Sequence, residues 1–144
     1  MKRAHSLLLL ALSLSACEQR TKGPPPPPSA KEWAALGREL GLKFPPSSRL
    51  LKLERQNGMD DMIRLQVALP TQDLPAFISD SAIHTEQLRE GGSCFVSGDE
   101  FWDLSQALHL RSFQAALPGA RFWCLGIDDG RPGTAYLYIM NYGT

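Results

Sequence analysis

Hydrophobic residues recur at helical spacing in one segment near the start of the regular part of the chain. Trp33, Leu36 and Leu40 lie three and four positions apart, which is the spacing of one helix face. Ser29 and Glu32 have the spacing of a capping box, and Gly41 stands where a glycine commonly ends a helix. The pattern predicts a helix between Ser29 and Gly41.

Two-residue alternation follows. Residues 51 to 55 and residues 63 to 69 have the alternation of strands, and Asn57-Gly58 between them is a turn signal. The second strand is the clearer one, with Ile63, Leu65, Val67 and Leu69 on one face. A hairpin is therefore expected, with a connection that extends as far as Asp61.

Two short helices are expected in the middle of the chain. Asp73 precedes Leu74, Pro75, Phe77 and Ile78, and proline is tolerated in a first helical turn. No regular period is present from residue 79 to residue 98. Ser97 and Glu100 are spaced as a second capping box, and apolar residues follow at helical spacing: Phe101, Leu104 and Leu108.

The end of the chain returns to a period of two. Residues 110 to 117, 121 to 128 and 134 to 142 are separated by a Pro118-Gly119 turn and by a turn over residues 128 to 133. They predict a three-stranded meander. An N-terminal hairpin, a C-terminal meander and short helices between them indicate an α+β fold on an antiparallel sheet, formed by residues 31 to 144 as one domain.

The first seventeen residues have a different character. Lys2 and Arg3 precede an apolar stretch, residues 7 to 14, that is shorter than the roughly 20 residues needed to cross a bilayer, and a signal peptide fits this pattern. It ends in Leu14-Ser15-Ala16-Cys17. This tetrapeptide resembles the lipobox of bacterial lipoprotein precursors, which implies cleavage before Cys17 and lipid on its sulfur, so that residues 1 to 16 are the signal peptide.

Residues 17 to 30 have the composition of a stalk. Pro24 to Pro28 favour polyproline II, which rises about 3.1 Å per residue. A cysteine carrying two or more acyl chains anchors stably to a membrane. By resemblance to enterobacterial lipoproteins, in which Asp after the cysteine favours inner-membrane retention, Glu18 indicates the outer membrane, facing the periplasm.

The formal charge of the mature chain limits the kinds of partner that it is expected to bind. Thirteen Lys and Arg and fifteen Asp and Glu follow Cys17, so the mature chain carries a formal charge of 13 − 15 = −2. A weakly acidic chain lacks the basic surface that phosphate backbones require, so a nucleic-acid partner is not expected. No cofactor motif or metal-ligand spacing is present, and neither a cofactor nor a metal is expected.

The three cysteines suggest a disulfide. If lipid occupies Cys17, an even pair remains, Cys94 and Cys124, in a compartment where disulfides persist. A bridge would tie the irregular Cys94 region to the predicted meander. Two buried free thiols are the alternative, because cysteine is often buried without being bonded.

Few residues in the sequence have a pattern that suggests catalysis. Cys94 follows Gly91-Gly92-Ser93, which suggests a nucleophile with His84 or His109 as its base. The segment nevertheless differs from the Asp-Cys-Ser-Gly signature of papain-like envelope peptidases. Three acidic groups could supply ligands or an acid/base pair, although turns favour Asp for backbone reasons as well: Asp60-Asp61, Asp99-Glu100-Asp103 and Asp128-Asp129.

Tyrosines in the last predicted strand form a candidate binding surface for peptides or glycans. Alternation places Tyr136, Tyr138 and Tyr142 on one face and Leu137 and Ile139 on the other. The tyrosines are an exposed stripe if the leucine face is the core, and part of the core if another element covers them.

Two hypotheses of function follow. The first is a non-enzymatic binding or accessory lipoprotein of the cell envelope, such as an inhibitor, an immunity protein or an assembly factor, whose partner is an envelope protein or glycan. The second is an envelope hydrolase that uses Cys94 or the acidic turn residues. The first is favoured because no spacing of catalytic residues stands out.

Overall fold

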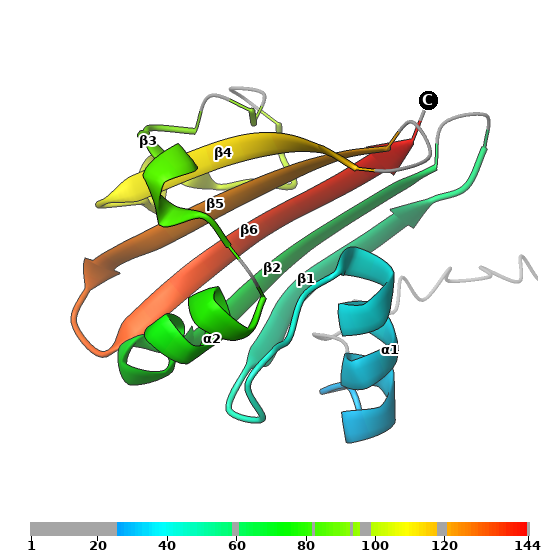
Figure 1. Ribbon diagram of the computed structural model, residues 1–144, viewed down its shortest axis with the longest axis horizontal. Helices are drawn as coiled ribbons and strands as arrows, with labels where there is room; N and C mark the ends of the chain where they lie inside the picture. Colours follow the sequence, from blue (N-terminus) through cyan, green and yellow to red (C-terminus); the bar gives the residue numbers. More distant parts are fainter. Residues whose placement is uncertain are drawn as a thin grey trace, which may run out of the picture.

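A six-stranded antiparallel sheet dominates the fold, and two helices pack on one of its faces (Figure 1). The computed structural model describes residues 26–58, 61–81, 83–92, 94–95, 99–117 and 121–143. The helices are α1 (Ala30–Leu40) and α2 (Leu74–Asp80). The strands are β1 (Arg49–Gln56), β2 (Met62–Pro70), β3 (Arg89–Glu90), β4 (Leu110–Leu117), β5 (Arg121–Arg131) and β6 (Thr134–Gly143).

Helix α1 begins and ends where its capping residues predict. The Ser29 amide and hydroxyl both donate to the Glu32 carboxylate, and the Glu32 amide donates back to Ser29 Oγ at 3.3 Å. Gly41 ends the helix with a φ of 68°, a left-handed conformation that glycine adopts without a steric penalty. Leu36 and Leu40 face the core.

The predicted hairpin and meander are both present and belong to one sheet. The strand order is β1-β2-β6-β5-β4-β3, so the last strand in the chain pairs with the hairpin. Leu65 of β2 lies opposite Ile139 of β6, and both are fully buried. The α+β antiparallel fold expected from the sequence is confirmed.

Each face of the sheet carries its own apolar cluster. On the helix face, α1 and α2 cover the larger cluster, which includes Phe77 and Leu137. On the outer face, residues 94–95 and 99–104 pack on β5 and β6 and form with them a second cluster, here called the outer cluster: Phe95, Trp102, Cys124 and Tyr138. The domain is therefore three layers deep over part of the sheet.

The helix predicted from Ser97 onward is wrong for the residues that the structure describes. Only Leu104–Gln106 form a helical turn there, of the 3₁₀ type, and Ser97 lies outside the described residues. The Asp99 carboxylate accepts the Phe101 amide at 2.9 Å, a local turn that competes with helix formation. Phe101 and Leu104 pack on the outer face instead, whereas Leu108 is 68% exposed.

Two smaller expectations also change. Strand β5 continues to Arg131, so the turn predicted over residues 128 to 133 is confined to Pro132-Gly133. Asp73 does stand at the start of α2, but its side chain makes no capping bond and accepts the Ser47 hydroxyl at 2.6 Å. No helix among the described residues has the length and apolar character of a membrane span.

Candidate functional site

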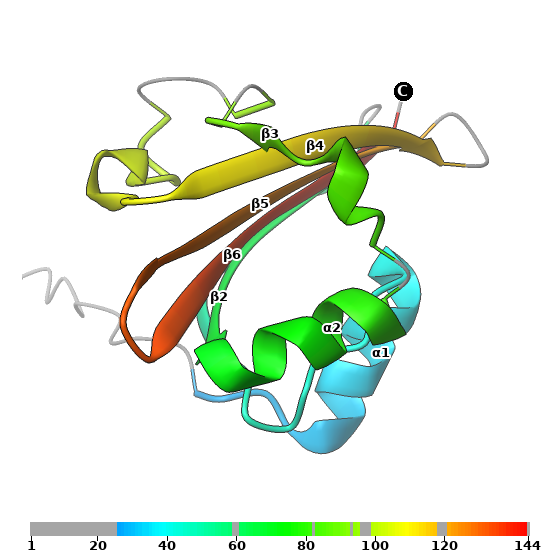
Figure 2. The ribbon, with the colours of Figure 1, turned by 60° about the vertical axis from the view of Figure 1, so that its left-hand side comes forward.

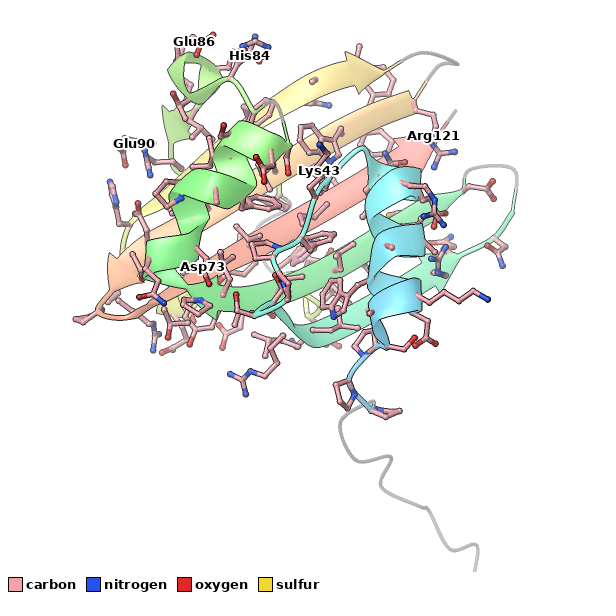
Figure 3. All side chains as sticks on the ribbon, turned by 60° about the horizontal axis from the view of Figure 1, so that its bottom comes forward. Lys43, Asp73, His84, Glu86, Glu90 and Arg121 are labelled. Carbon is pink, nitrogen blue, oxygen red and sulfur yellow. A yellow bond between two sulfur atoms is a disulfide. The ribbon has the colours of Figure 1, made fainter. Side chains whose placement is uncertain are left out.

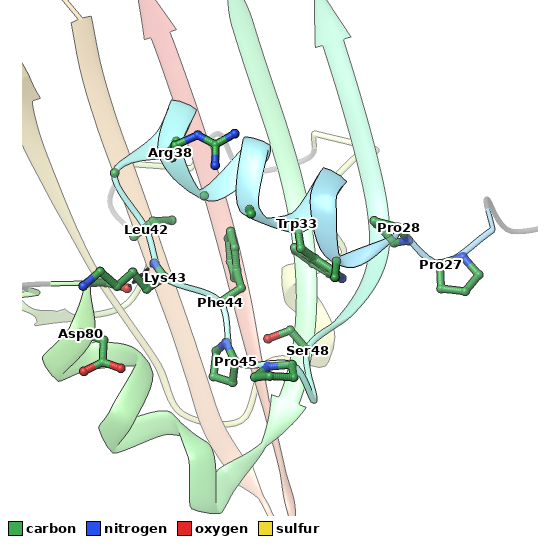
Figure 4. A pocket seen from close by; sticks show the side chains of 16 residues that line it. Pro27, Pro28, Trp33, Arg38, Leu42, Lys43, Phe44, Pro45, Ser48 and Asp80 are labelled. Atoms are coloured by element: carbon green, nitrogen blue, oxygen red, sulfur yellow. Dashed lines mark hydrogen bonds between the residues drawn. The ribbon is translucent and has the colours of Figure 1, made fainter.

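A groove of about 800 Å³ runs between helix α1 and the segment that follows it (Figure 4). One wall is α1, including Trp33 and Ala34, and the other is the stretch from Leu42 to Ser48. Pro27 and Pro28 close one end. Asp80 and Ser81, from the end of α2, close the other.

Aromatic rings and prolines give the groove its apolar character. The rings of Trp33 and Phe44 lie with centroids 4.9 Å apart, and Phe44 stacks in turn on the buried Phe77 at 5.7 Å. Pro45 and Pro46 continue the same wall. The aromatic surface is thus held against the core, which keeps it rigid while leaving Trp33 and Phe44 partly exposed.

Close backbone contacts fix the segment after α1. The Leu42 amide donates to Gly37 O at 2.8 Å, and a Cβ on Gly37 would lie 2.5 Å from the Leu42 carbonyl oxygen. Only glycine permits this approach. The Lys43 amide then donates to Ser81 Oγ at 2.9 Å, which joins the segment to α2.

One buried polar side-chain atom in the groove lining has no hydrogen-bond partner among the described residues. Ser48 is 8% exposed, and its hydroxyl makes no hydrogen bond. Ser81, which is equally buried, has its hydroxyl engaged by Lys43. A buried hydroxyl without a partner destabilises the folded state by about 1–3 kcal/mol.

Charged groups stand at the rim. Arg38, Lys43 and Asp80 line the groove and are exposed. None of the three takes part in an ion pair with another described residue. The rim therefore offers two cations and one anion to a ligand that crosses the apolar centre.

Cys94 and Cys124 form the predicted disulfide. Their Cα atoms lie 6.1 Å apart, within the usual range of about 4.4–6.8 Å. The bond ties the segment after β3 to the middle of β5. A cysteine nucleophile at position 94 is excluded by it, so the thiol version of the hydrolase hypothesis is wrong.

The tyrosines do not form an exposed stripe. Tyr138 is 3% exposed and lies in the outer cluster, where its ring contacts those of Phe95 and Trp102 edge to face. Burial raises its pKa to about 12. Tyr136 and Tyr142 remain partly exposed. The segment that crosses the outer face covers the centre of the predicted surface, so Tyr138 is a core residue.

His84 and His109, the two histidines among the described residues, lie at the surface, and each contacts a carboxylate. His84 Nδ1 lies 3.2 Å from Glu86, and Figure 3 labels these two side chains next to each other. His109 Nδ1 lies 2.6 Å from Asp129, and this hydrogen bond raises the pKa of His109. Both are contacts between an imidazole and a carboxylate at the surface.

Most of the acidic turn residues that the structure describes are engaged locally. Asp128 is 1% exposed and accepts the amides of Leu108, His109 and Gly130. Asp61, Asp99 and Asp103 also accept hydrogen bonds within their own turns, and Asp60 lies outside the described residues. Among the residues that the structure describes, no three metal-ligating side chains come together.

Comparison with known proteins adds no family. No family model, no curated protein and no solved structure matches the chain. The groove beside α1 is thus the feature that points most directly to a function, and the sequence did not predict it. Its walls include the Pro45-Pro46-Ser47-Ser48 stretch, in which neither a helical nor a strand period is present, so only the proline pair signals a fixed wall.

Proposed function

We propose that this protein is a lipid-anchored binding protein of the bacterial cell envelope that acts by contact and not by catalysis. Cys17 is the proposed attachment site, on the outer membrane facing the periplasm. The Cys94–Cys124 bond supports export, because disulfides persist in oxidising compartments such as the periplasm. Residues 1 to 25, which include Cys17 and Glu18, lie outside the described residues.

The α1 groove is the observation that carries the binding role. It combines a rigid apolar wall around Trp33 and Phe44 with an unpartnered hydroxyl on Ser48 and charged groups at the rim. Ligand sites commonly have this composition, an apolar surface with a few convergent polar groups. An apolar groove with charged groups at its rim suits a segment of an envelope protein or a glycan.

The position of the groove relative to the proposed anchor also fits an accessory role. Pro27 and Pro28 line one end of it and belong to the predicted stalk. The groove would therefore stand at the membrane-proximal side of the domain. A partner held there would be an envelope component, as expected for an inhibitor, an immunity protein or an assembly factor.

Site-specific photo-crosslinking tests the groove. Ala34 and Ala35 are both exposed neighbours on α1, but only Ala34 lines the groove. A photoreactive residue at Ala34 should capture a partner in the native envelope, and the same residue at Ala35 should not. Lys43→Ala should weaken the Ala34 crosslink. Equal capture at both positions would show that the groove is not the binding site.

Metabolic labelling tests the anchor separately. Cells that express the full chain are fed a fatty-acid analogue, and label on the protein is compared with label on the Cys17→Ser variant. Loss of label in the variant is the expected result. Unchanged label would place the lipid elsewhere and would leave the groove experiment unaffected.

A further inference from the structure

The two edges of the sheet differ in how well they are protected from pairing with another strand. Strand β1 has one free edge, and it carries four charged residues: Arg49, Lys52, Glu54 and Arg55. Strand β4 carries β3 along its outer edge, but β3 pairs only with Arg111 and Ser112. The remainder of β4, residues 113 to 117 (Phe-Gln-Ala-Ala-Leu), has no charge. Uncharged free edges are templates for pairing with another strand.

The hydrogen-bond register shows which groups are left free. The Gly91 amide donates to Leu110 O at 2.8 Å, so the backbone of Leu110 points toward β3. In an antiparallel ladder this direction alternates, which places the backbone groups of Gln114 and Ala116 on the same edge. Within the described part of the chain, no backbone group bonds to Gln114 or Ala116 on this edge. Figure 2 shows β4 continuing past β3.

Space for an incoming strand is present beside these groups. A groove of about 480 Å³ lies along the edge, between β4 and the turn that contains Gln87. Phe113 and Ala115 line it from the helix face. The side chains of Gln114 and Ala116 are exposed on the outer face.

We propose that this edge pairs with the same edge of a second copy of the chain, in an antiparallel dimer whose twofold axis passes beside Ala115. This register places Gln114 opposite Ala116 of the partner, and it is the one in which all four free backbone groups are bonded. Ala115 then faces its own counterpart, and two small side chains permit the close approach of a non-hydrogen-bonded pair. The uncharged sequence adds no repulsion between the copies, and twofold dimers are the commonest oligomers.

The inference is independent of the α1 groove and of the lipid anchor. It rests on the pairing of β3 with β4, on the register, and on the lack of charge. Because the free edge is short, the dimer should be weak and should form as the concentration of the chain is raised.

A proline variant tests the pairing without disturbing the sheet. Ala116→Pro removes an amide that faces the free edge, so no bond to β5 is lost. Sedimentation velocity on the full chain with Cys17→Ser should show a dimer whose fraction rises with concentration, and Ala116→Pro should leave a monomer with an unchanged thermal midpoint. A monomer at every concentration, or a dimer that survives Ala116→Pro, would overturn the proposal.

Cysteine crosslinking tests the register and does not depend on the proline variant. A non-hydrogen-bonded antiparallel pair has Cα atoms about 4.5 Å apart, within disulfide range, whereas diagonal neighbours are about 7–8 Å apart. In the Cys17→Ser background, Ala115→Cys should therefore form a covalent dimer on oxidation. Gln114→Cys, which faces Ala116 of the partner, should form several-fold less. Equal yields, or none from Ala115→Cys, would refute the twofold axis at Ala115.

Discussion

The guanidinium group of Arg64 lies 4.7 Å from the centre of the Phe101 ring, and the same group is ion-paired with Asp99 and with Glu54. Arg64 belongs to β2, whereas Phe101 and Asp99 belong to the segment that crosses the outer face. Its side chain is 15% exposed, much less than an ordinary surface arginine. This contact and the Cys94–Cys124 bond are two separate attachments of that segment to the sheet.

Replacing Arg64 should therefore destabilise the domain measurably. Arg64→Met removes the ion-pair partner of the Asp99 carboxylate, whose side chain is only 24% exposed. A loss of about 1–3 kcal/mol in the free energy of unfolding is expected, because the pair is partly buried. Urea denaturation of the variant measures it.

Arg55 provides the matched control. It pairs with Glu39, and both side chains are 44% exposed. Arg55→Met should lower the free energy of unfolding by less than about 1 kcal/mol, as is usual for surface pairs. Similar losses for the two variants would mean that Arg64 has no special role in holding the outer segment.

The Cys94–Cys124 disulfide should stabilise the fold more than any other single bond in the described part of the chain. Cys94 and Cys124 are 30 positions apart, and closing such a loop stabilises a fold by about 3–4 kcal/mol in the chain-entropy model. Reduction, or the double change to alanine, should lower the free energy of unfolding by this order. Thiol counting on the denatured, unreduced Cys17→Ser chain should find none, and two reactive thiols would contradict the bond.

Stability should fall at high pH because of Tyr138. Burial raises its pKa from about 10 in the unfolded chain to about 12 in the folded one. A raised folded pKa gives a contribution that is complete below pH 10 and is lost as the pH rises through 12, here of order 2 kcal/mol. Tyr138→Phe cannot ionise, so its unfolding free energy should decline less between these pH values. Identical pH profiles for the two chains would contradict the buried position.

Features that depend on neighbouring residues could be predicted from the sequence. Of the contacts between distant segments, the disulfide could be predicted and the pairing of β2 with β6 could not. Ser29, Glu32 and Gly41 act within one turn of a helix, so their spacing alone predicted both ends of α1. The disulfide was accessible by counting, because lipid on Cys17 leaves an even pair. The pairing of β2 with β6 joins segments more than sixty residues apart, and nothing in either strand specifies its neighbour.

The outer face shows why the sequence left open whether the tyrosines are exposed or covered. Alternation correctly placed Tyr138 and Leu137 on opposite faces of β6, but it gives no information about what covers each face. The cover is an irregular segment whose contacts are tertiary, namely the Arg64 ion pairs and the Cys94 disulfide. A segment without a period can bury an aromatic ring as well as a helix can.

Two equally buried serines should respond in opposite ways to the loss of their hydroxyls. Ser48 and Ser81 are each 8% exposed, but only the Ser81 hydroxyl has a partner, the Lys43 amide. Ser81→Ala leaves that amide unpaired and should lower the free energy of unfolding by about 1 kcal/mol. Ser48→Ala removes an unsatisfied group and should leave it unchanged or raise it by up to about 1 kcal/mol. Urea denaturation of both variants decides this, and a loss at Ser48 equal to that at Ser81 would show that the Ser48 hydroxyl is already satisfied.

The same pair also separates stability from binding at the groove. If a ligand accepts or donates a hydrogen bond at Ser48, Ser48→Ala should reduce photo-crosslinking from Ala34 although the folded state is no less stable. Because one lost hydrogen bond is worth roughly 0.5–1.5 kcal/mol, partner capture should fall about two- to tenfold at limiting concentration. Unchanged capture would show that the buried hydroxyl has no role in recognition, and binding at the groove would then rest on Trp33, Phe44 and the charged rim.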